Sequence, residues 1–291
     1  MKLIGFTCTY NEAEMVPYVM PYVERMGYDK FIVYDNESTD NTVELLKQYP
    51  FVEVRTYKTD KVNKVEIRTK LMADSFTEAH RYSYSNNKEV VWMSWTDFDE
   101  VIFPIHLYRK TLKELLSWEY YMYNVYESSL VNVIPQKDIE QEKLLEFVKN
   151  GNFIHEFPGL RCKLWDNWLG HKTLLIRIND FETIMCFNGN HKCGLKPHKD
   201  KTIKKIPDGL HAFHLKYVNK NSFINKLKTD NYLNNTTTYK DMNGAKFNAI
   251  FESTYNTSYP LEYYFMMNDM KLLSPHPYND KGVFEMSKNG V

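Results

Sequence analysis

The 291-residue sequence predicts an α/β fold, in which a mostly parallel β-sheet is flanked by helices as in Rossmann-like domains. Two observations predict it. Short apolar runs alternate with segments whose apolar residues recur at helical spacing, a pattern typical of βαβ units with right-handed crossovers. Polar clusters also follow three of the apolar runs, at Tyr10–Glu12, Asp35–Asp40 and Asp97–Glu100. In a parallel sheet these clusters meet at the carboxyl edge, where ligands bind.

Four short apolar runs predict the strands of this sheet. They cover Leu3–Thr9, Lys30–Tyr34, Phe51–Tyr57 and Val90–Ser94. The helices between them are predicted at Glu14–Met26, Thr42–Gln48 and Glu66–Ser83. Gly27 supplies a stop for the first helix, and Ser38 and Thr39 are N-cap candidates for the second.

After about residue 105 the alternation loosens. Helices are predicted at Leu112–Trp118, Ile139–Val148, Ser222–Tyr232 and Leu261–Leu272, and strands at Tyr121–Val133 and Lys172–Ile178. The sequence shows neither an internal repeat nor a low-complexity linker. One compact domain with a C-terminal helical extension is the simplest account.

Composition bears on two questions, whether the protein binds nucleic acid and in which cellular compartment it is found. Lys+Arg and Asp+Glu both number 37, and this balance argues against nucleic acid as the main partner. The four cysteines match neither a zinc knuckle nor a CxxC redox motif. The sequence has no signal-peptide pattern and no apolar stretch as long as a membrane helix. We therefore expect a cytoplasmic protein without a transmembrane segment, compatible with peripheral membrane contact or with a virus-infected host cell.

Asp97 and Asp99 are the first candidates for chemistry. They follow the strand Val90–Ser94, and two residues that are two apart in a strand point the same way, so both carboxylates would face one cation. Oxygen ligands suit Mg²⁺ or Mn²⁺, which bind substrate phosphates and offset charge on a diphosphate leaving group. The alternative interpretation is a polar turn, because Asp-x-Asp is frequent by chance.

Asp35 is the second candidate. It ends the strand Lys30–Tyr34, where a carboxylate can accept hydrogen bonds from a nucleobase N–H or from ribose hydroxyls. The alternative interpretation is a helix cap, with Ser38 or Thr39 as the capping residue.

Taken together, TYNEAEMVPYV, FIVYDNESTDNT and WTDFDEVIFP resemble the GT-A nucleotide-sugar glycosyltransferases, in their family 2-like branch. The pattern there is a strand ending in Asn-Glu, a strand ending in Asp-x-x-Ser-x-Asp-x-Thr, and a later Asp-x-Asp. The resemblance covers roughly residues 3–105. It implies metal-dependent transfer of a hexose from a UDP- or GDP-linked donor to a glycan, lipid-linked or protein acceptor. We expect inversion at the anomeric carbon, and retention stays open as the alternative.

The resemblance also implies roles for the matching positions. Donor contacts would come from Thr9, Tyr10, Asn11, Glu12, Asp35, Arg68 and Asp97. Among these, Asp35 would bind the base and Arg68 would reach the diphosphate. Asp97 would lie near the ribose and the metal, and Asp99 would be the direct metal ligand. Residues 1–105 would then form the nucleotide-sugar-binding half, 106–221 the acceptor-binding half, and 222–291 the helical extension.

A histidine completes the metal shell in several enzymes of this fold. His191 in GNHK and His214 in HAFHLKYVNKNSFINK are similar to histidines of related transferases. Neutral imidazole is a suitable ligand for Mn²⁺. A structural histidine is the alternative for each of them, and His211 is a weaker candidate. The third protein ligand stays open between His191 and His214.

The catalytic base is not specified by the resemblance. Inverting transfer needs a carboxylate that deprotonates the acceptor hydroxyl. We expect Asp166 in LWDNWLG to fill this role, since the neighbouring tryptophans can stack on a sugar ring and raise the carboxyl pKa by desolvation. Glu156 and Asp180 are rivals, and a surface turn is the alternative interpretation.

Two other functions are compatible with such a sheet edge. A sugar-phosphate nucleotidylyltransferase also holds a metal with carboxylates, but it normally carries a glycine-rich loop after the first strand, where this chain has TYNEAE. A non-catalytic nucleotide-sugar-binding module with a degenerate site is the other, and the intact Asp-x-Asp argues against it.

Overall fold

The computed structural model describes residues 1–58, 64–86, 88–104, 110–135, 141–158, 160–164, 171–187, 192–207, 210–219 and 258–260. The first half contains β1 (Lys2–Thr9), α1 (Val16–Met26), β2 (Lys30–Asp35), α2 (Thr42–Leu46), β3 (Val52–Thr56), α3 (Lys64–Ser85), β4 (Val91–Trp95) and β5 (Glu100–Phe103). The second half contains α4 (Leu112–Trp118), β6 (Val125–Ile134), α5 (Gln141–Lys149), β7 (Arg161–Leu164), β8 (His171–Arg177), β9 (Phe181–Phe187), β10 (Lys192–Pro197), β11 (His211–His214) and β12 (Tyr259–Pro260). The 3₁₀ turns Ile154–Glu156 and Ile178–Asp180 precede β7 and β9.

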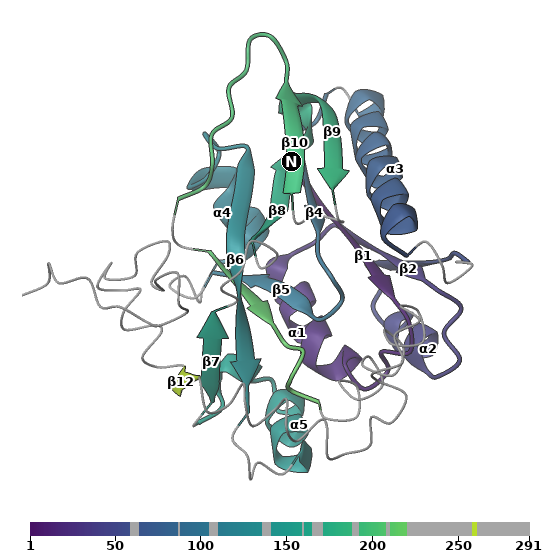
Figure 1. Ribbon diagram of the computed structural model, residues 1–291, viewed down its shortest axis with the longest axis vertical. Helices are drawn as coiled ribbons and strands as arrows, with labels where there is room; N and C mark the ends of the chain where they lie inside the picture. Colours follow the sequence, from purple (N-terminus) through teal and green to yellow (C-terminus); the bar gives the residue numbers. More distant parts are fainter. Residues whose placement is uncertain are drawn as a thin grey trace, which may run out of the picture.

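Ten of the described strands form one large sheet with a curled far end, and β9 and β10 form a separate two-stranded sheet (Figure 1). The order of the large sheet is β12-β7-β6-β8-β4-β1-β2-β3, with β11 beside β6 and β5 beside β11. The pairings set β5, β7 and β8 antiparallel to their neighbours, and the other strands of the ten all run the same way. The predicted α/β fold with a mostly parallel sheet is therefore confirmed.

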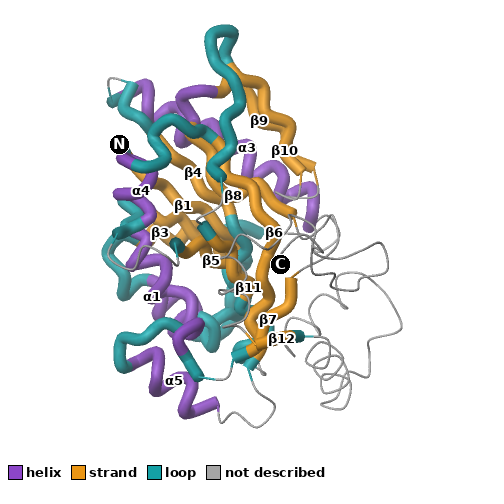
Figure 2. Tube along the Cα trace, turned by 90° about the vertical axis from the view of Figure 1, so that its left-hand side faces the viewer, coloured by secondary structure: helices purple, strands orange, loops and turns teal. Residues whose placement is uncertain are grey.

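Helices cover both faces of the sheet, and each face has its own core. On one face, α1 contacts β5 and the helices α2, α4 and α5. Figure 2 shows α1, α4 and α5 along one side of the strands. On the other face, α3 packs on β1, β4 and the separate β9–β10 hairpin, as Figure 1 shows. Apolar residues at alternate strand positions supply both cores, as expected for a sheet buried on both sides.

The ends of α1 and α4 follow local capping rules, whereas α2 has Asn41 at its N-cap without a side-chain cap, so the predicted cap at Ser38 or Thr39 is wrong. Gly27 caps α1 in the left-handed conformation, with φ of 75°. Thr111 and Glu114 form a reciprocal capping box at the start of α4. None of the helices that the structure describes is both long enough and apolar enough to cross a bilayer.

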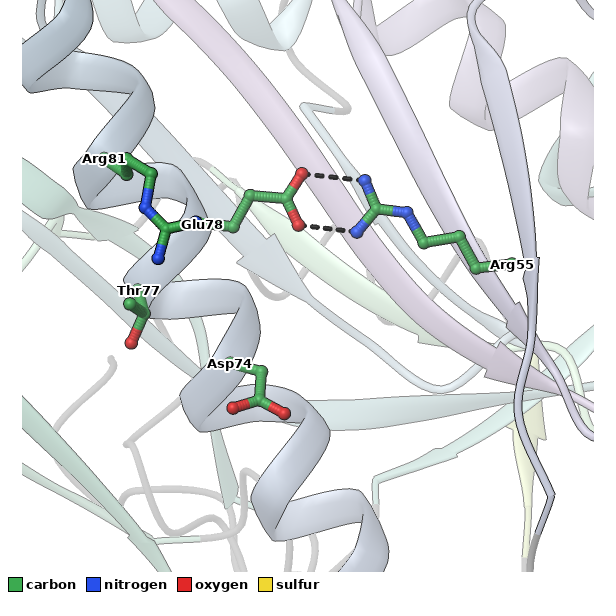
Figure 3. A pocket seen from close by; sticks show the side chains of 5 residues that line it. All are labelled: Arg55, Asp74, Thr77, Glu78 and Arg81. Carbon is green, nitrogen blue, oxygen red and sulfur yellow. Dashed lines mark hydrogen bonds and ion pairs between the residues drawn. The ribbon is translucent and has the colours of Figure 1, made fainter.

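An ion pair joins α3 to the outer strand β3 (Figure 3). The Arg55 guanidinium donates two hydrogen bonds to the Glu78 carboxylate, at 2.5 and 2.8 Å. Asp74, Thr77 and Arg81 line the same groove from α3. Hydrogen bonding to Glu78 raises the pKa of Arg55 further above its usual range, so this cation stays committed to its partner. The ion pair in this groove therefore has a structural role, which is to join α3 to β3.

The structure departs from the sequence-based expectation in its short strands. The predicted strand Tyr121–Val133 begins only at Val125, since Tyr121 and Met122 lie in an exposed turn. The strands β5, β7 and β11, each of four residues, were not predicted. Runs this short lack a measurable period and depend on neighbours for pairing. The predicted helices Ser222–Tyr232 and Leu261–Leu272 lie outside the described residues.

Candidate functional site

One edge of the sheet gathers the polar residues. It is formed by the carboxyl ends of β1, β2, β4 and β11 and by the amino ends of β5 and β8, which run the other way. Thr9 at the end of β1 is paired in register with Asp35 at the end of β2. The residues brought together there are Thr9, Asp35, Arg68, Asp97, Asp99, Glu100, Asn132, Lys172 and His214. The prediction that the three polar clusters share one edge is confirmed.

The loops after β1 and β2 interlock. The backbone N–H of Asn11 donates to Ser38 Oγ at 2.9 Å, and Asn11 Oδ1 accepts the backbone N–H of Thr39 at 2.8 Å. The N–H of Glu12 donates to Thr42 Oγ1 at 2.8 Å. Asn11 lies in the left-handed region with φ of 53°, a conformation that asparagine tolerates. The Asn11 side chain thus serves to join the two loops.

Asp35 is buried, with 3% of its surface exposed. Its carboxylate accepts the Ser38 hydroxyl at 2.5 Å and the Ser38 backbone N–H at 3.0 Å. Ser38 also accepts the N–H of Asn11, so Asp35 is held through the same interlock. Ser38 does not cap α2, whose N-cap position is Asn41, so these bonds hold the loop after β2 and the capping interpretation is wrong. Tyr10 is exposed beside this loop.

Tyr57 lies next to Asp35 at this edge of the sheet. Tyr57 follows β3, and its backbone N–H donates to the Asp35 carbonyl at 2.9 Å. Burial raises the pKa of Tyr57, with Cys8 adding to this and Arg68 opposing it. The phenol is therefore neutral and in electrostatic contact with both the Asp35 side and the Arg68 side of the edge.

Asp97 and Asp99 lie in a turn between β4 and β5, so the expectation that strand alternation points both carboxylates the same way is wrong. The turn is closed by the Glu100 N–H, which donates to the Asp97 carbonyl at 3.0 Å. Phe98 is buried in the core under α1. Because its ring anchors the middle of the turn, the two flanking carboxylates take different partners.

Asp97 belongs to a group of four charges. It forms ion pairs with Arg68 of α3 and with Lys172 of β8, whose Nζ lies 3.0 Å from Asp97 Oδ2. Lys172 also contacts Glu100 Oε1 at 2.6 Å. The predicted Arg68 therefore lies at the site, paired with a predicted carboxylate.

Asp99 faces His214, one of the two histidines between which the sequence left the third ligand open. His214 Nε2 lies 3.3 Å from Asp99 Oδ2, and His214 Nδ1 lies 2.8 Å from Asn132 Oδ1. Asp99 and His214 are 3% and 5% exposed. A second tie joins them, since the Leu215 N–H donates to the Asp99 carbonyl at 2.7 Å. With the amide oxygen of Asn132 accepting from Nδ1, the Nε2 atom is the ring nitrogen that faces Asp99.

Thr9 Oγ1 and Arg68 Nε are buried polar atoms at this edge without a hydrogen-bond partner among the described residues. Asp97 Oδ1 is a third such atom, and its one recorded contact is the ion pair with Arg68. Buried donors and acceptors are nearly always satisfied, so such atoms point to a bound ligand or to ordered water.

Other predicted residues lie elsewhere. Asp166 and His191 are outside the described residues. Asp180 accepts hydrogen bonds from Arg177 and Asn124 and follows β8, at the opposite edge of the sheet. Its rival role as base is therefore excluded by position. Glu156 accepts the Phe153 N–H in a capping turn. His211 begins β11, while His214 ends it.

Sequence reasoning missed Lys172, Glu100 and Asn132. Lys172 opens a predicted strand, and Glu100 was named only as the end of the polar cluster Asp97–Glu100, so neither was given a role. Their burial was the missing observation, since all three are buried in the structure. Asn132 had no local signal because its partner His214 is 82 residues away in the chain. Among the described residues, no group of three or more His, Cys, Asp or Glu side chains surrounds a common point.

Comparison with solved structures returns distant likenesses. The crystal structure of TarS from S. aureus has 13% identity and a TM-score of 0.43, covering 88% of this chain and 43% of its own. This chain thus spans less than half the length of that protein. The mannosyltransferase PcManGT from Pyrobaculum calidifontis, solved with GDP-Man and Mn²⁺, has 18% identity and a TM-score of 0.28, covering 44% and 35% of the two chains. A 4-diphosphocytidyl-2C-methyl-D-erythritol synthase has 11% identity and a TM-score of 0.32, covering 62% and 75%.

The family comparison matches most of the chain by sequence. No curated protein matches the sequence. The sequence model of glycosyltransferase family 92 matches residues 7–247, which include every residue of the site. The expected glycosyltransferase is confirmed, and the chain belongs to glycosyltransferase family 92.

Proposed function

We propose that this glycosyltransferase is metal-dependent and takes a UDP- or GDP-linked sugar as its donor. The observation that carries the proposal is the pair formed by Asp99 and His214 at the carboxyl edge of the sheet, 3.3 Å apart and both buried. Asp35, Arg68 and the interlocked loops lie along the same edge. Base, diphosphate and metal would therefore be bound side by side, as transfer from a nucleotide sugar requires.

The two side chains fit Mn²⁺ or Mg²⁺. In an octahedral shell with ligand distances of about 2.1 Å, neighbouring ligand atoms lie about 3 Å apart. The observed separation of His214 Nε2 and Asp99 Oδ2 is close to this. Asn132 fixes the ring orientation from the other side, in the manner of an outer-shell partner. Two protein ligands are enough for such ions, because substrate phosphates and waters fill the remaining positions.

The buried polar atoms without hydrogen-bond partners support a nucleotide sugar bound at this edge of the sheet. Thr9 Oγ1 and Arg68 Nε are buried polar atoms whose partners a ribose hydroxyl and a phosphate oxygen would supply. The residues proposed to contact the donor remain Thr9, Tyr10, Asn11, Glu12, Asp35, Arg68 and Asp97. Asn11 acts through the backbone it holds, since its side chain is occupied by Thr39.

The reaction is proposed to be inverting transfer of a hexosyl group. When bound, the metal offsets negative charge on the departing diphosphate. Arg68 has a guanidinium that can add hydrogen bonds to the same group. Deprotonation of the acceptor hydroxyl is assigned to Asp166, and the acceptor is proposed to be a glycan, a lipid-linked sugar or a protein.

A donor panel tests the proposal. The protein is incubated with UDP- and GDP-linked sugars, with and without Mn²⁺, and release of nucleoside diphosphate is measured. We expect slow hydrolysis of one donor that requires Mn²⁺ and falls at least a hundredfold in Asp99→Ala. The exposed Asp200 provides the control Asp200→Ala, with unchanged hydrolysis.

Two outcomes would replace the proposal. Pyrophosphate release from a nucleoside triphosphate and a sugar phosphate would identify a nucleotidylyltransferase. Donor binding without turnover, even with acceptor extracts, would identify a non-catalytic binding module. Equal hydrolysis with EDTA and with Mn²⁺ would contradict metal dependence while leaving the transferase class intact.

A further inference from the structure

Lys172 is a buried cation next to the metal-binding turn. Its side chain is 1% exposed, and it enters the site at the amino end of β8, where sequence reasoning expected only a strand. Its Nζ lies 2.6 Å from Glu100 Oε1 and 3.0 Å from Asp97 Oδ2. An ammonium group removed from water is costly unless it is paired, so these two carboxylates are what allow it to be there.

The contacts of Lys172 and Glu100 meet on Asp97. Glu100 Oε2 accepts the Asp97 backbone N–H at 3.1 Å, and the Glu100 N–H donates to the Asp97 carbonyl. Lys172 holds the Asp97 side chain. Asp97 is therefore fixed at its N–H, at its carbonyl and at its carboxylate, while Phe98 fixes the next residue in the core.

The charges in this group cancel. Arg68 and Lys172 carry two positive charges, and Asp97 and Glu100 carry two negative ones. Asp99 stands outside the group and directs its carboxylate to His214. The orientation of Asp99 thus depends on a turn whose first residue is held by Lys172.

We propose that Lys172 is a positioning residue of the donor site, which holds Asp97 and the turn to Asp99 in the geometry that binds the nucleotide and its metal. This inference rests on the proposed function, since it assigns Lys172 a task in the same site. The contacts through which Lys172 would act are those with Asp97 and Glu100.

The test needs a variant that keeps the protein folded. Lys172→Met alone leaves the buried Glu100 carboxylate without its cation, which destabilises strongly. The double variant E100Q/K172M removes both charges, and the side-chain amide introduced by E100Q retains an oxygen for the Asp97 N–H. Replacing both members of a buried ion pair is often tolerated. The matched control is E127Q/K205M, which makes the same two changes at the ion pair of Glu127 with the largely exposed Lys205.

Two measurements decide the question. Amide hydrogen exchange is followed in the segment 95–103, and binding of UDP and GDP with Mn²⁺ is measured by calorimetry. We expect E100Q/K172M to exchange at least tenfold faster in this segment and to bind the nucleotide at least tenfold more weakly, with the control within twofold of wild type. A purely structural role would lower thermal stability and leave the affinity unchanged.

The outcomes separate this inference from the proposed function. Exchange and affinity within twofold of wild type in a folded E100Q/K172M would overturn the positioning role, as would failure of this variant to fold. If the wild-type protein binds neither nucleotide, the proposed donor class is wrong. The exchange rates would still decide whether Lys172 holds the turn.

Discussion

Ser38 joins Asp35 to the interlocked loops after β1 and β2, and Ser38→Ala tests how much these two hydrogen bonds contribute. Its hydroxyl donates to Asp35 Oδ1 at 2.5 Å and accepts the Asn11 N–H at 2.9 Å. A hydrogen bond to a buried charged group contributes about 1.5–3 kcal/mol, and a neutral one contributes about 1 kcal/mol. The substitution should therefore lower the free energy of unfolding by about 3 kcal/mol.

The neighbouring Thr39 supplies the control. Its hydroxyl makes only exposed contacts with Asn11, at 3.3 and 3.4 Å. Thr39→Ala should cost less than about 1 kcal/mol, because the backbone N–H that Asn11 accepts is retained. Urea unfolding followed by circular dichroism measures both, and calorimetry with UDP and GDP should show weaker binding only for Ser38→Ala. Losses for the two variants within about 0.5 kcal/mol of each other would refute the reasoning.

Three further predictions concern the framework of the site. Phe98→Ala should cost about 3–5 kcal/mol in urea unfolding, because it empties a core position under the turn; a loss below about 1 kcal/mol would show that the ring is not an anchor. Burial lowers the pKa of His155 to about 4. In the unfolded chain His155 has its ordinary pKa of about 6.5, so between pH 6.5 and pH 4 the unfolded chain binds a proton that the folded protein does not bind. The free energy of unfolding should fall by about 1.4 kcal/mol per pH unit from pH 6.5 towards pH 4. His155→Gln should flatten this slope, and an unchanged slope would assign it to other groups. Glu78→Gln should cost about 1 kcal/mol, since its partner Arg55 is only partly buried, and the loss should shrink in 1 M salt; a cost that salt leaves unchanged would show that the pair is not electrostatic.

The parallel half of the fold was predictable because its signals are local. Each strand of that half is an apolar run, and Gly27 and the Ser38 region mark helix ends within a few residues. Strand–helix alternation then determines parallel pairing, and parallel pairing places the polar clusters at one edge. The position of the site therefore followed from topology alone.

The division of labour in the site was not predictable from spacing. Asp97 and Asp99 are two apart in either a strand or a turn, and the burial of Phe98 decides between the two. His214 was a candidate beside His191, but its partner Asn132 becomes visible only when β6 and β11 pair. Lys172 at the start of a strand resembles any surface lysine until the fold buries it. These outcomes depend on contacts between residues far apart in the chain.

The central claim is that Asp99 and His214 hold the cation that carries the donor diphosphate. Electron spin-echo spectroscopy of bound Mn²⁺ with UDP or GDP tests it directly, because a coordinated imidazole adds nitrogen modulation and a bound diphosphate adds phosphorus coupling. The account predicts both signals in the wild type, loss of the nitrogen signal in His214→Gln, and loss of Mn²⁺ binding in Asp99→Asn. Phosphorus coupling without a nitrogen signal in the wild type, or a nitrogen signal that survives His214→Gln, would contradict it.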